Sequence, residues 1–449
     1  MTGTRPVRWF SELGVTDALV AGGKGANLGE LSNAGLPVPP GFVLTAEAYL
    51  QAIERSGSRQ FLARSGVNAP TGDPIALARL AASLTREIRG IELPAETVAA
   101  ILQAYRRLGR GPVAVRSSAT SEDAAGTSFA GMNETFTNVY TEEELLTCIT
   151  DCWASTYGAR MIAYRASHGI TEEPAIAVVV QSMVDSDRSG VIFSADPRPA
   201  TPGRVVVEGA FGLGEVVVGG QLIPDTYLLD RRGPRLLEIR IGYKSHKIIR
   251  SREGGDLHVA LSVKEATRRV LSDREAIQLA ELGLQVERHY GSAQDLEWAI
   301  QGGQIYLVQS RPITTRRQPQ PPAERPDSQP AAIRGQLLTG LGVAPGLASG
   351  PVRTLTTPDH ASQFRDGEVL VSTVTSPDWM PILRRAAGLV TDGGGVTCHA
   401  AILSRELGIP SVVGARTATR LLHDGQRITV DGHTGMVAEG DDESRPSAR

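Results

Sequence analysis

His399 stands at the start of a helix-like segment, directly after a run of glycines. Residues 388–392, GLVTD, have the apolar pattern of a strand and lead into the glycines at 393–395. Glycine permits positive φ angles and lets another group approach the backbone closely. Thr397 is the expected N-cap of a helix over residues 399–407. His399 therefore falls in the first turn of that helix.

The first turn of a helix suits an imidazole that carries a negative group. Free N–H groups and the helix dipole favour negative charge there. An imidazole can attack a phosphorus atom and then hold the phosphoryl group beside these amides and the Thr397 hydroxyl. Gly408 and Pro410 follow as expected helix-ending residues. A lone histidine at a helix start is more often structural, and Cys398, which has no neighbouring base, is interpreted as a packing residue.

Basic and hydroxyl-bearing residues of the N-terminal part could contact phosphate. Lys24 lies in a glycine-rich turn before a helix, where plain surface charge is the alternative. Arg116 leaves a strand into a hydroxyl-rich loop, and residues 127–136 form a small-residue loop whose amides could cover phosphates. The segments at 22–25 and 212–220 lack the spacing of a P-loop and of a Rossmann fingerprint, so neither site is supported.

The segment GGGVTCHAAILSRELGIPSVVG resembles the phosphohistidine signature of phosphoenolpyruvate synthase and pyruvate phosphate dikinase. Residues 8–313 resemble the ATP-binding domain of the same family, an ATP-grasp fold shared by rifampicin phosphotransferase. The resemblance implies that His399 carries a phosphoryl group with Thr397 beside it. It also implies an ATP site, whose residues are Lys24, Arg116, Gly131, Thr135, Gln181 and Arg311.

By the same resemblance, Glu297 and Gln309 are Mg²⁺ ligands, which suits a hard cation with oxygen donors. They lie on the two strands of a predicted hairpin over 295–312. A two-residue turn at Gly302-Gly303 would place Glu297 opposite Val308 instead of Gln309. We therefore predict a three-residue turn or a bulge near 302–304. A regular two-residue turn would count against both residues being ligands.

Two further lysines, Lys244 and Lys247 in the segment GYKSHK, could also reach phosphate, and solvated charge is an equal alternative.

The chain divides at residues 314–335, which hold five prolines among polar residues and have no apolar periodicity. We interpret this stretch as a linker, with a surface loop inside one domain as the alternative. The fold class is α+β, with an ATP-grasp type ATP-binding domain over 1–313, expected to contain two subdomains. A small α/β swivelling phosphohistidine domain covers 336–440, and 441–449 is an expected disordered tail.

Apolar periodicity predicts the elements of both domains. Helices are expected over 24–34, 45–55, 75–89, 95–107, 142–168, 378–386 and 399–407. Strands are expected over 112–116, 175–184, 190–194, 204–208, 367–372, 388–392 and 427–431, with the hairpin over 295–312.

The overall composition and net charge limit the kinds of partner that the protein is expected to bind. A net charge of −3 gives no reason to expect nucleic acid or an anionic membrane. The sequence has no apolar run of 18 residues and no signal peptide pattern. Its three cysteines do not form a disulfide framework, and Cys148 and Cys152 are interpreted as small buried residues of a helix. A cytoplasmic location is the default expectation.

The resemblance implies an ATP-dependent phosphotransferase of dikinase type. It would phosphorylate its own His399, convert ATP to AMP and phosphate, and pass the phosphoryl group to a small-molecule acceptor. The chain stops about 40 residues after His399, so we expect the barrel that binds pyruvate or phosphoenolpyruvate in the long dikinases to be absent. The drug-binding domain of rifampicin phosphotransferase has no counterpart either. The acceptor, which the sequence does not identify, would sit in the cleft between the domains or on a separate subunit.

Two alternatives stay open. The protein could be a phosphohistidine carrier or regulatory protein that acts on a protein partner and shows negligible turnover alone. It could also be an ATP-driven condensing enzyme of specialised metabolism.

Overall fold

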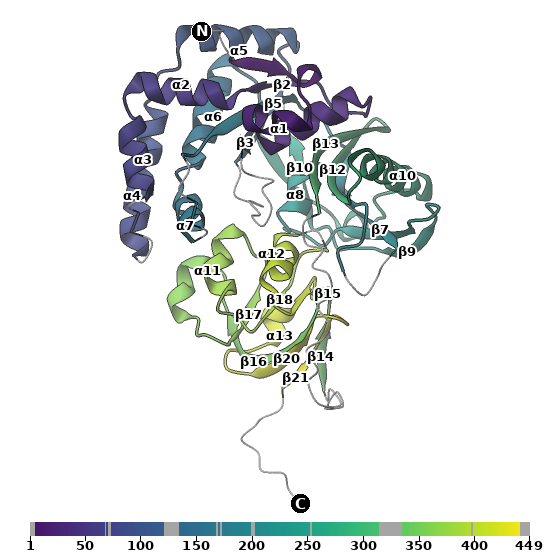
Figure 1. Ribbon diagram of the computed structural model, residues 1–449. Coiled ribbons are helices and arrows are strands. Elements are labelled where there is room, and N and C mark those ends of the chain that lie inside the picture. The colour runs from purple at the N-terminus through teal and green to yellow at the C-terminus, as the bar shows by residue number, and fades with distance from the viewer. Residues whose placement is uncertain are drawn as a thin grey trace, which may run out of the picture. The chain divides into compact units, whose positions relative to one another are not determined.

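The computed structural model describes residues 5–67, 69–70, 73–120, 134–167, 169–170, 173–198, 203–251, 254–313, 335–396 and 398–440. The chain forms two compact units, each assembled from separate stretches of sequence. Unit 1 comprises Met1–Asp187, Ile249–His258 and Leu296–Pro312, and unit 2 comprises Arg188–Ile248, Val259–Asp295 and Ile313–Arg449. Figure 1 labels most of their helices and strands.

Unit 1 is built on a five-stranded antiparallel sheet with the order β1-β2-β5-β3-β4. Its strands are β1 Val7–Trp9, β2 Gly41–Leu44, β5 Ile176–Ser182, β3 Val113–Ala119 and β4 Thr135–Val139. Its helices are α1 Ala18–Asn33, α2 Ala46–Ser56, α3 Arg59–Val67, α4 Pro74–Arg89, α5 Ala95–Arg107, α6 Glu142–Ser155 and α7 Ala159–Ser167. Two short 3₁₀ helices, η1 Phe10–Glu12 and η2 Val15–Asp17, precede α1.

The two faces of this sheet belong to different cores. Val178 and Val180 of β5 pack with residues of α2, α4, α5 and α6. Ala177 and Val179 point to the other face and pack with α1. Because successive strand residues alternate between faces, each strand presents its odd and even positions to different helices.

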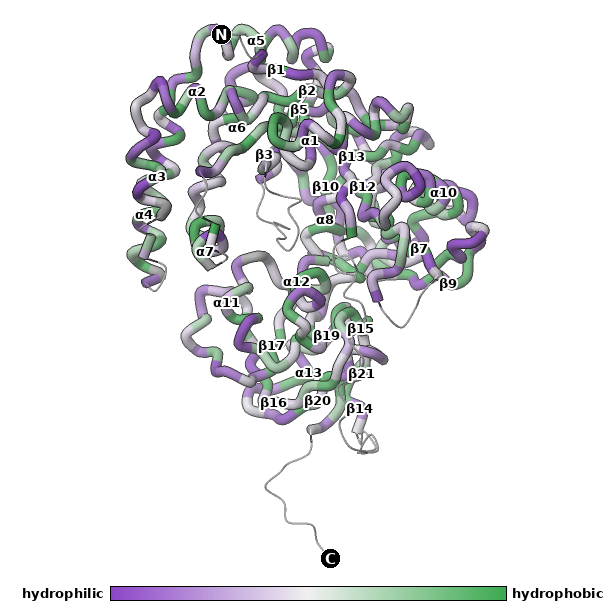
Figure 2. Tube along the Cα trace, in the orientation of Figure 1, coloured by the Kyte–Doolittle hydropathy of each residue, from purple (hydrophilic) through white to green (hydrophobic). Residues whose placement is uncertain are grey.

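The central strands are buried on both sides, and β2 and β5 are accordingly apolar throughout most of their length. The amphipathic helix α4 alternates the two colours of Figure 2 along its length. Its apolar stripe faces the core, and its polar stripe faces solvent.

Unit 2 contains two sheets. Strands β6 Arg188–Phe193, β7 Arg204–Phe211, β8 Asp225–Asp230 and β9 Leu236–Arg240 follow one another in antiparallel order. The helices of this part are α8 Glu215–Val218, α9 Val263–Ala266 and α10 Asp273–Tyr290. Three strands contribute residues to both units, namely β10 His246–Arg250, β11 Asp256–Ala260 and β12 Gln294–Gln301. The partner of β12 in its hairpin is β13 Gln304–Pro312 of unit 1.

The second sheet of unit 2 has eight strands in the order β14-β21-β20-β16-β17-β18-β19-β15. They are β14 Gln336–Thr339, β15 Leu341–Ala344, β16 Leu347–Thr354, β17 Val369–Ser372, β18 Gly388–Thr391, β19 Ser411–Val413, β20 Arg427–Asp431 and β21 Met436–Glu439. The four strands β16 to β19 are parallel neighbours, and the other pairs are antiparallel.

Helices cover both faces of this eight-stranded sheet. α11 Met380–Leu383 and α12 His399–Leu407 pack against Leu370 and Leu389 on one face. α13 Ala418–Leu421 contributes to the core on the other face, with Val371 and Val390. The short 3₁₀ helices η3 Pro358–Gln363 and η4 Pro377–Trp379 complete the unit. The described strands of this sheet all lie within residues 336–440 and alternate with helices.

Most predicted elements are present, but the prediction of one helix over 142–168 is wrong. The segment forms α6 and α7, separated at Thr156, Tyr157 and Gly158. The amides of Tyr157 and Gly158 bond to carbonyls three residues back, which tightens the chain and ends α6. The expected helix over 378–386 is likewise shorter, because only Pro377–Trp379 and Met380–Leu383 are helical. The mixture of helices and strands confirms the α+β composition.

Candidate active site

Lys24 lies just after a break in α1. Gly22 has φ 67° and ψ 171°, which is not helical. A Cβ at Gly22 would lie 2.2 Å from the carbonyl oxygen of Ser118 on β3, so only glycine fits against this strand. The Ser118 hydroxyl donates to the carbonyl of Ala21 and accepts from the amide of Gly25. The start of α1, with the buried Lys24, is thereby fixed to the face of β3 that carries Ser118.

Arg116 and Gln181 belong to this same face of the sheet. Arg116 is two residues before Ser118 on β3, and it pairs with Val179 of β5. Gln181 is two residues after Val179, and its amide donates to the carbonyl of Pro39. Since side chains two apart share a face, three predicted nucleotide-binding residues come from one side of the sheet.

The guanidinium of Arg116 joins β3 to the hairpin β12–β13. Its Nη1 donates to the carbonyl of Val308 over 2.8 Å. Its Nη2 contacts two acceptors, the Glu297 carboxylate at 3.2 Å and the Gln309 side-chain oxygen. The two predicted metal ligands therefore meet at one nitrogen atom.

The predicted turn of this hairpin is wrong. β12 ends at Gln301 and β13 begins at Gln304, so the turn has two residues. Gly302 and Gly303 have φ of 56° and 85°, as a type I′ turn requires, and this type matches the twist of the strands. On the register argument alone, the regular turn counts against the ligand pair. The shared contact with Arg116 nevertheless brings the Glu297 and Gln309 oxygens together.

The other residues predicted for the ATP site are Thr135, Arg311 and Gly131. Thr135 begins β4 and is the register partner of Arg116. Arg311 lies on β13, two residues beyond Gln309, and is partly buried. Gly131 lies outside the described residues.

Glu297 and Gln309 supply some, but not all, of the oxygen ligands that a small divalent cation needs. A carboxylate and an amide oxygen are the donor types that Mg²⁺ prefers. Among the described residues, no group of three or more His, Cys, Asp or Glu side chains could hold a metal ion. Such a pair suits Mg²⁺ bound together with phosphate oxygens and water rather than in a cage made by the protein alone.

The helix that begins at His399 is confirmed. α12 runs from His399 to Leu407, and His399 is buried in its first turn. Gly408 ends the helix in the left-handed region, and its N–H donates to the carbonyl of Ser404. The N-cap, however, is Cys398 rather than Thr397, with no side-chain cap bond. Thr397 itself lies outside the described residues.

The glycines before His399 allow two close approaches. Gly394 has φ 102°, and a Cβ there would meet the Cys398 sulfur at 2.7 Å. A Cβ at Gly395 would lie 2.6 Å from the Glu208 carboxylate. Glu208 is fully buried on β7 and accepts from the amide of Val396 over 2.7 Å. The glycine run thus lets this segment lie against an acidic side chain of the same unit.

Cys398 has the environment of a packing residue. Its side chain is 2% exposed, and burial raises the pKa of the thiol to about 11. A thiol with so high a pKa is a poor nucleophile at neutral pH. Cys148 and Cys152 are also free thiols whose pKa is raised by burial.

Lys244 is neither a phosphate contact nor a solvated charge. It is fully buried and forms an ion pair with Asp225, which is also fully buried. The Asp225 carboxylate further accepts from the amides of Gly242 and Val270. Burial lowers the pKa of Lys244, while Asp225 raises it. Lys247 lies on β10 and is partly exposed.

Glu208 and Arg405 were not among the predicted site residues. Arg405 lies on α12, and its Nη1 donates to the carbonyl of Val396, three residues before His399. The sequence held one signal for Glu208, a charged residue in the otherwise apolar strand RVVVE. A buried carboxylate in such a strand requires a partner. Nothing in the local pattern indicated that the partner is the segment before His399.

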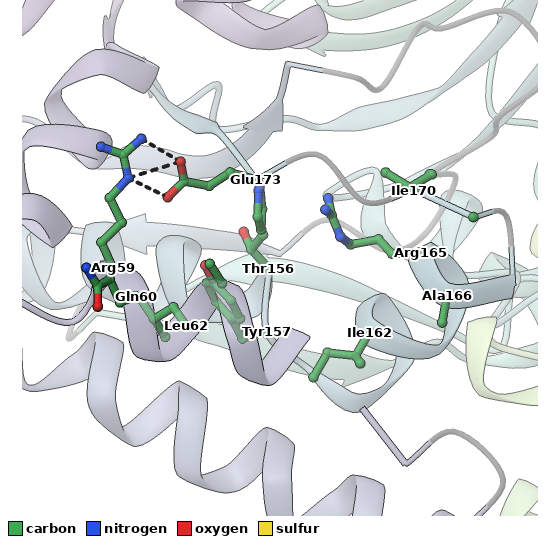
Figure 3. A pocket seen from close by; sticks show the side chains of 13 residues that line it. Arg59, Gln60, Leu62, Thr156, Tyr157, Ile162, Arg165, Ala166, Ile170 and Glu173 are labelled. Atoms are coloured by element: carbon green, nitrogen blue, oxygen red, sulfur yellow. Dashed lines mark hydrogen bonds and ion pairs between the residues drawn. The ribbon is translucent and has the colours of Figure 1, made fainter. Parts of the chain in front are cut away.

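A separate cavity lies among the helices of unit 1. It has a volume of about 480 Å³ and an apolar wall that includes Leu62 and Ile162. Figure 3 shows the ion pair of Arg59 with Glu173 beside it. None of the residues predicted to bind nucleotide or metal lines this cavity.

In the part of the chain that the structure describes, no helix has the length and apolar character needed to cross a bilayer.

Known proteins resemble both parts of the chain. The pyruvate phosphate dikinase AMP/ATP-binding domain matches residues 18–331, and the mobile domain of PEP-utilising enzymes matches residues 364–435. A probable phosphoenolpyruvate synthase of Methanothermobacter thermautotrophicus is 42% identical over 97% of this chain and 63% of its own. One of Archaeoglobus fulgidus is 43% identical over 97% of this chain and 58% of its own.

The chain therefore spans about three fifths of the length of these relatives. Among solved structures, D-alanine–D-alanine ligase of Helicobacter pylori is similar over 53% of each chain, with 13% identity and a TM-score of 0.24. The two domain matches and the extent of sequence identity establish that the chain belongs to the phosphoenolpyruvate synthase and pyruvate phosphate dikinase family.

Proposed function

We propose that the protein is an ATP-dependent phosphotransferase that phosphorylates its own His399 and then passes the phosphoryl group to a small-molecule acceptor. The observation that supports this most directly is the position of His399, which is buried in the first turn of α12 behind a glycine run. Free amides in the first turn of a helix and the helix dipole stabilise a phosphoryl group on the imidazole. The match of this segment to the mobile domain of PEP-utilising enzymes supports the same role.

In the proposed reaction, an imidazole nitrogen of His399 attacks the β-phosphorus of ATP. The bond from that phosphorus to the bridging oxygen of the α-phosphate breaks, and AMP leaves with the electron pair. Water then attacks the γ-phosphorus, the bond from that phosphorus to the oxygen bridging it to the β-phosphorus breaks, and inorganic phosphate leaves, so that a single phosphoryl group remains on His399. Lys24, Arg116 and Arg311 would neutralise the charge that develops on the phosphates, because phosphoryl transfer depends mainly on positioning and electrostatics.

Glu297 and Gln309 would hold Mg²⁺ in this site. Mg²⁺ held there would supply positive charge that reduces the negative charge of the phosphates. Thr135 and Gly131 would belong to the loop that covers the phosphates, and Gln181 would lie near the adenine or ribose. Thr397 would assist His399 through its hydroxyl.

The ATP-grasp assignment of the nucleotide domain and the swivelling of the histidine domain are parts of this proposal. Residues 314–335 would be the linker between the two, and they lie almost entirely outside the described residues. The acceptor would bind between the domains or on a separate subunit. We propose the cytoplasm as the location of the enzyme.

Incubation with ATP labelled separately at the β and γ positions tests the proposal. We expect the β label to be retained on the protein, the γ label to appear in inorganic phosphate, and AMP to be the nucleotide product. His399→Ala should abolish retention of the label, whereas His423→Ala, which removes an exposed histidine of the same domain, should not. Formation of ADP, or full ATP turnover by His399→Ala, would falsify the proposal.

A further inference from the structure

The Arg116 side chain occupies the acceptors of the proposed metal site. Its Nη2 contacts the Glu297 carboxylate at 3.2 Å and the Gln309 side-chain oxygen. Glu297 and Gln309 are the two side chains that would hold Mg²⁺. A single nitrogen of a cationic group therefore contacts both of them.

Burial makes this contact strong. The side chain of Arg116 is 9% exposed and that of Glu297 is 22% exposed, and Gln309 is buried. A carboxylate so poorly hydrated needs a positive partner, and a charge-assisted hydrogen bond from a guanidinium supplies it. Arg116 is the group that meets this need.

The guanidinium is not fully bonded in this position. Its Nε is buried and has no hydrogen-bond partner among the residues that the structure describes. A guanidinium has five N–H donors in a planar fork, which matches the geometry of a phosphate group. Phosphate oxygens could accept from the Nε as well as from the Nη atoms of Arg116.

Arg116 and a metal ion compete for these two side chains, because two cations held by the same carboxylate and the same amide oxygen repel each other. The backbone of Arg116 is held in β3 between β5 and β4. The exchange would therefore proceed by rotation of the side chain, with the strand left in place.

We propose that Arg116 and the metal ion exchange places when nucleotide binds. Without nucleotide, Arg116 neutralises Glu297 and bonds Gln309, so the site rejects the free metal ion. When the metal ion arrives with a nucleoside triphosphate, the phosphates accept the guanidinium, and the metal takes the two released oxygens. Metal and nucleotide thus bind with positive coupling, which by linkage is equal in both directions. The inference rests on the proposed function only in taking Glu297 and Gln309 as metal ligands.

The exchange predicts that a variant without the Arg116 charge binds the metal ion more tightly when no nucleotide is present. Arg116→Met removes the competing cation and keeps a side chain of similar length. We expect the affinity for Mn²⁺ in the absence of nucleotide to rise at least about tenfold, which corresponds to about 1.4 kcal/mol. Electron paramagnetic resonance of free Mn²⁺ measures this without any turnover. The coupling between Mn²⁺ and a non-hydrolysable ATP analogue should fall in the same variant.

Arg188→Met provides a matched control. Arg188 also donates to a backbone carbonyl, that of Val270, and forms a partly buried pair with a glutamate, Glu275. Its removal should leave the Mn²⁺ affinity unchanged. Adding Glu297→Gln to Arg116→Met should abolish the gain. If Arg116→Met does not fold, Arg116→Gln, which is also neutral, gives the same comparison.

Several results would overturn the exchange. They are an unchanged or weaker affinity of a folded Arg116 variant for Mn²⁺, a gain of the same size in Arg188→Met, and a gain that survives Glu297→Gln. None of these depends on transfer to His399. A tighter Mn²⁺ site in Arg116→Met combined with no β label on the wild-type protein would refute the proposed function and leave the exchange in place.

Discussion

Lys244 and Asp225 form an ion pair that solvent does not reach, because both side chains are fully buried. Asp225 also accepts from the amides of Gly242 and Val270 and from the Tyr227 hydroxyl. Replacing Lys244 by Met would leave a buried carboxylate with hydrogen bonds but no cation. We expect the free energy of unfolding to fall by about 3–5 kcal/mol, the usual cost of removing one member of a buried pair. Chemical denaturation at neutral pH measures this loss.

The charge, rather than the lost volume, should account for most of that loss. A second change, Asp225→Asn, removes the unpaired charge and keeps an acceptor, so the double variant should regain part of the stability. Lys247→Met, on the same segment but partly exposed, should change stability by less than about 0.5 kcal/mol. If Lys244→Met were as mild as Lys247→Met, the buried pair would not have the importance we assign to it.

The role of Gly395, in the segment before α12, can be tested separately from that of Gly408, at the end of the same helix. A Cβ at Gly395 would lie 2.6–2.9 Å from atoms of the Glu208 carboxylate. Gly395→Ala should therefore push the segment away from Glu208 or cost about 1–3 kcal/mol of overpacking. We expect the Val396 amide, which now donates to Glu208, to lose protection in hydrogen–deuterium exchange.

Gly408→Ala is the contrasting variant on the same helix. Gly408 has φ 69° and no atom within 4 Å of an added Cβ, so alanine would cost about 1–2 kcal/mol of backbone strain. Protection of the Val396 amide should survive this change. Shortening the acid in Gly395→Ala/Glu208→Asp should restore protection. Equal loss of protection in both single variants would show that global instability, and not the contact with Glu208, is responsible.

Elements with strong local signals could be predicted from the sequence. The helix 399–407 was predicted with the bounds that α12 has, because a glycine run and Gly408 delimit it. The helix α10 was missed, although Ser272 and Glu275 form a capping box and Gly291 ends it in the left-handed region. Among the site residues, Lys24, Arg116 and Gln181 were assigned to ATP by resemblance alone, and no local pattern indicated that α1 lies on the sheet face that carries Arg116 and Gln181. The contact of Glu208 with Val396 joins residues 188 positions apart, and no local pattern records such a pairing.

The turn at Gly302-Gly303 shows why register arguments from sequence are fragile. Strict alternation places Glu297 and Gln309 on different faces when the turn has two residues. Both nevertheless reach Arg116, because long side chains can cover the distance that backbone register alone would forbid. The local conformations of Gly302 and Gly303 decide the turn type. The meeting of Glu297 and Gln309 at one atom depends instead on Arg116, which lies on a third strand, β3.

At the scale of the whole molecule, the domain boundary predicted from composition and the compact units defined by contacts are different kinds of division. The proline-rich stretch 314–335 was identified by composition, whereas contacts group residues from Ile313 onward with Arg188–Ile248 and Val259–Asp295. Composition reports where a chain is unable to build a core. Contacts report which segments pack together, and they depend on pairs such as Glu208 with Val396 that are distant in sequence.

The composition of 314–335 predicts a protease-sensitive boundary. Trypsin can cut after Arg316, Arg317 and Arg334, whereas the bond after Arg325 precedes a proline. At low protease ratio we expect the first cuts at these three positions, identified by mass spectrometry. First cuts within the helices or strands of unit 1 would contradict the boundary.

Cleavage at this boundary should change the kinetic order of His399 labelling. A tether keeps two parts of one chain at an effective concentration in the millimolar range. In the intact protein, the first-order rate of β-label transfer to His399 should not depend on protein concentration. If the fragments separate after cleavage, that rate should fall about tenfold on a tenfold dilution, because transfer has become bimolecular. Fragments that remain associated on a sizing column should keep the concentration-independent rate of the intact chain. A dilution effect of equal size in the intact protein would mean that transfer to His399 occurs between molecules, so that the tether is not what delivers the histidine to ATP.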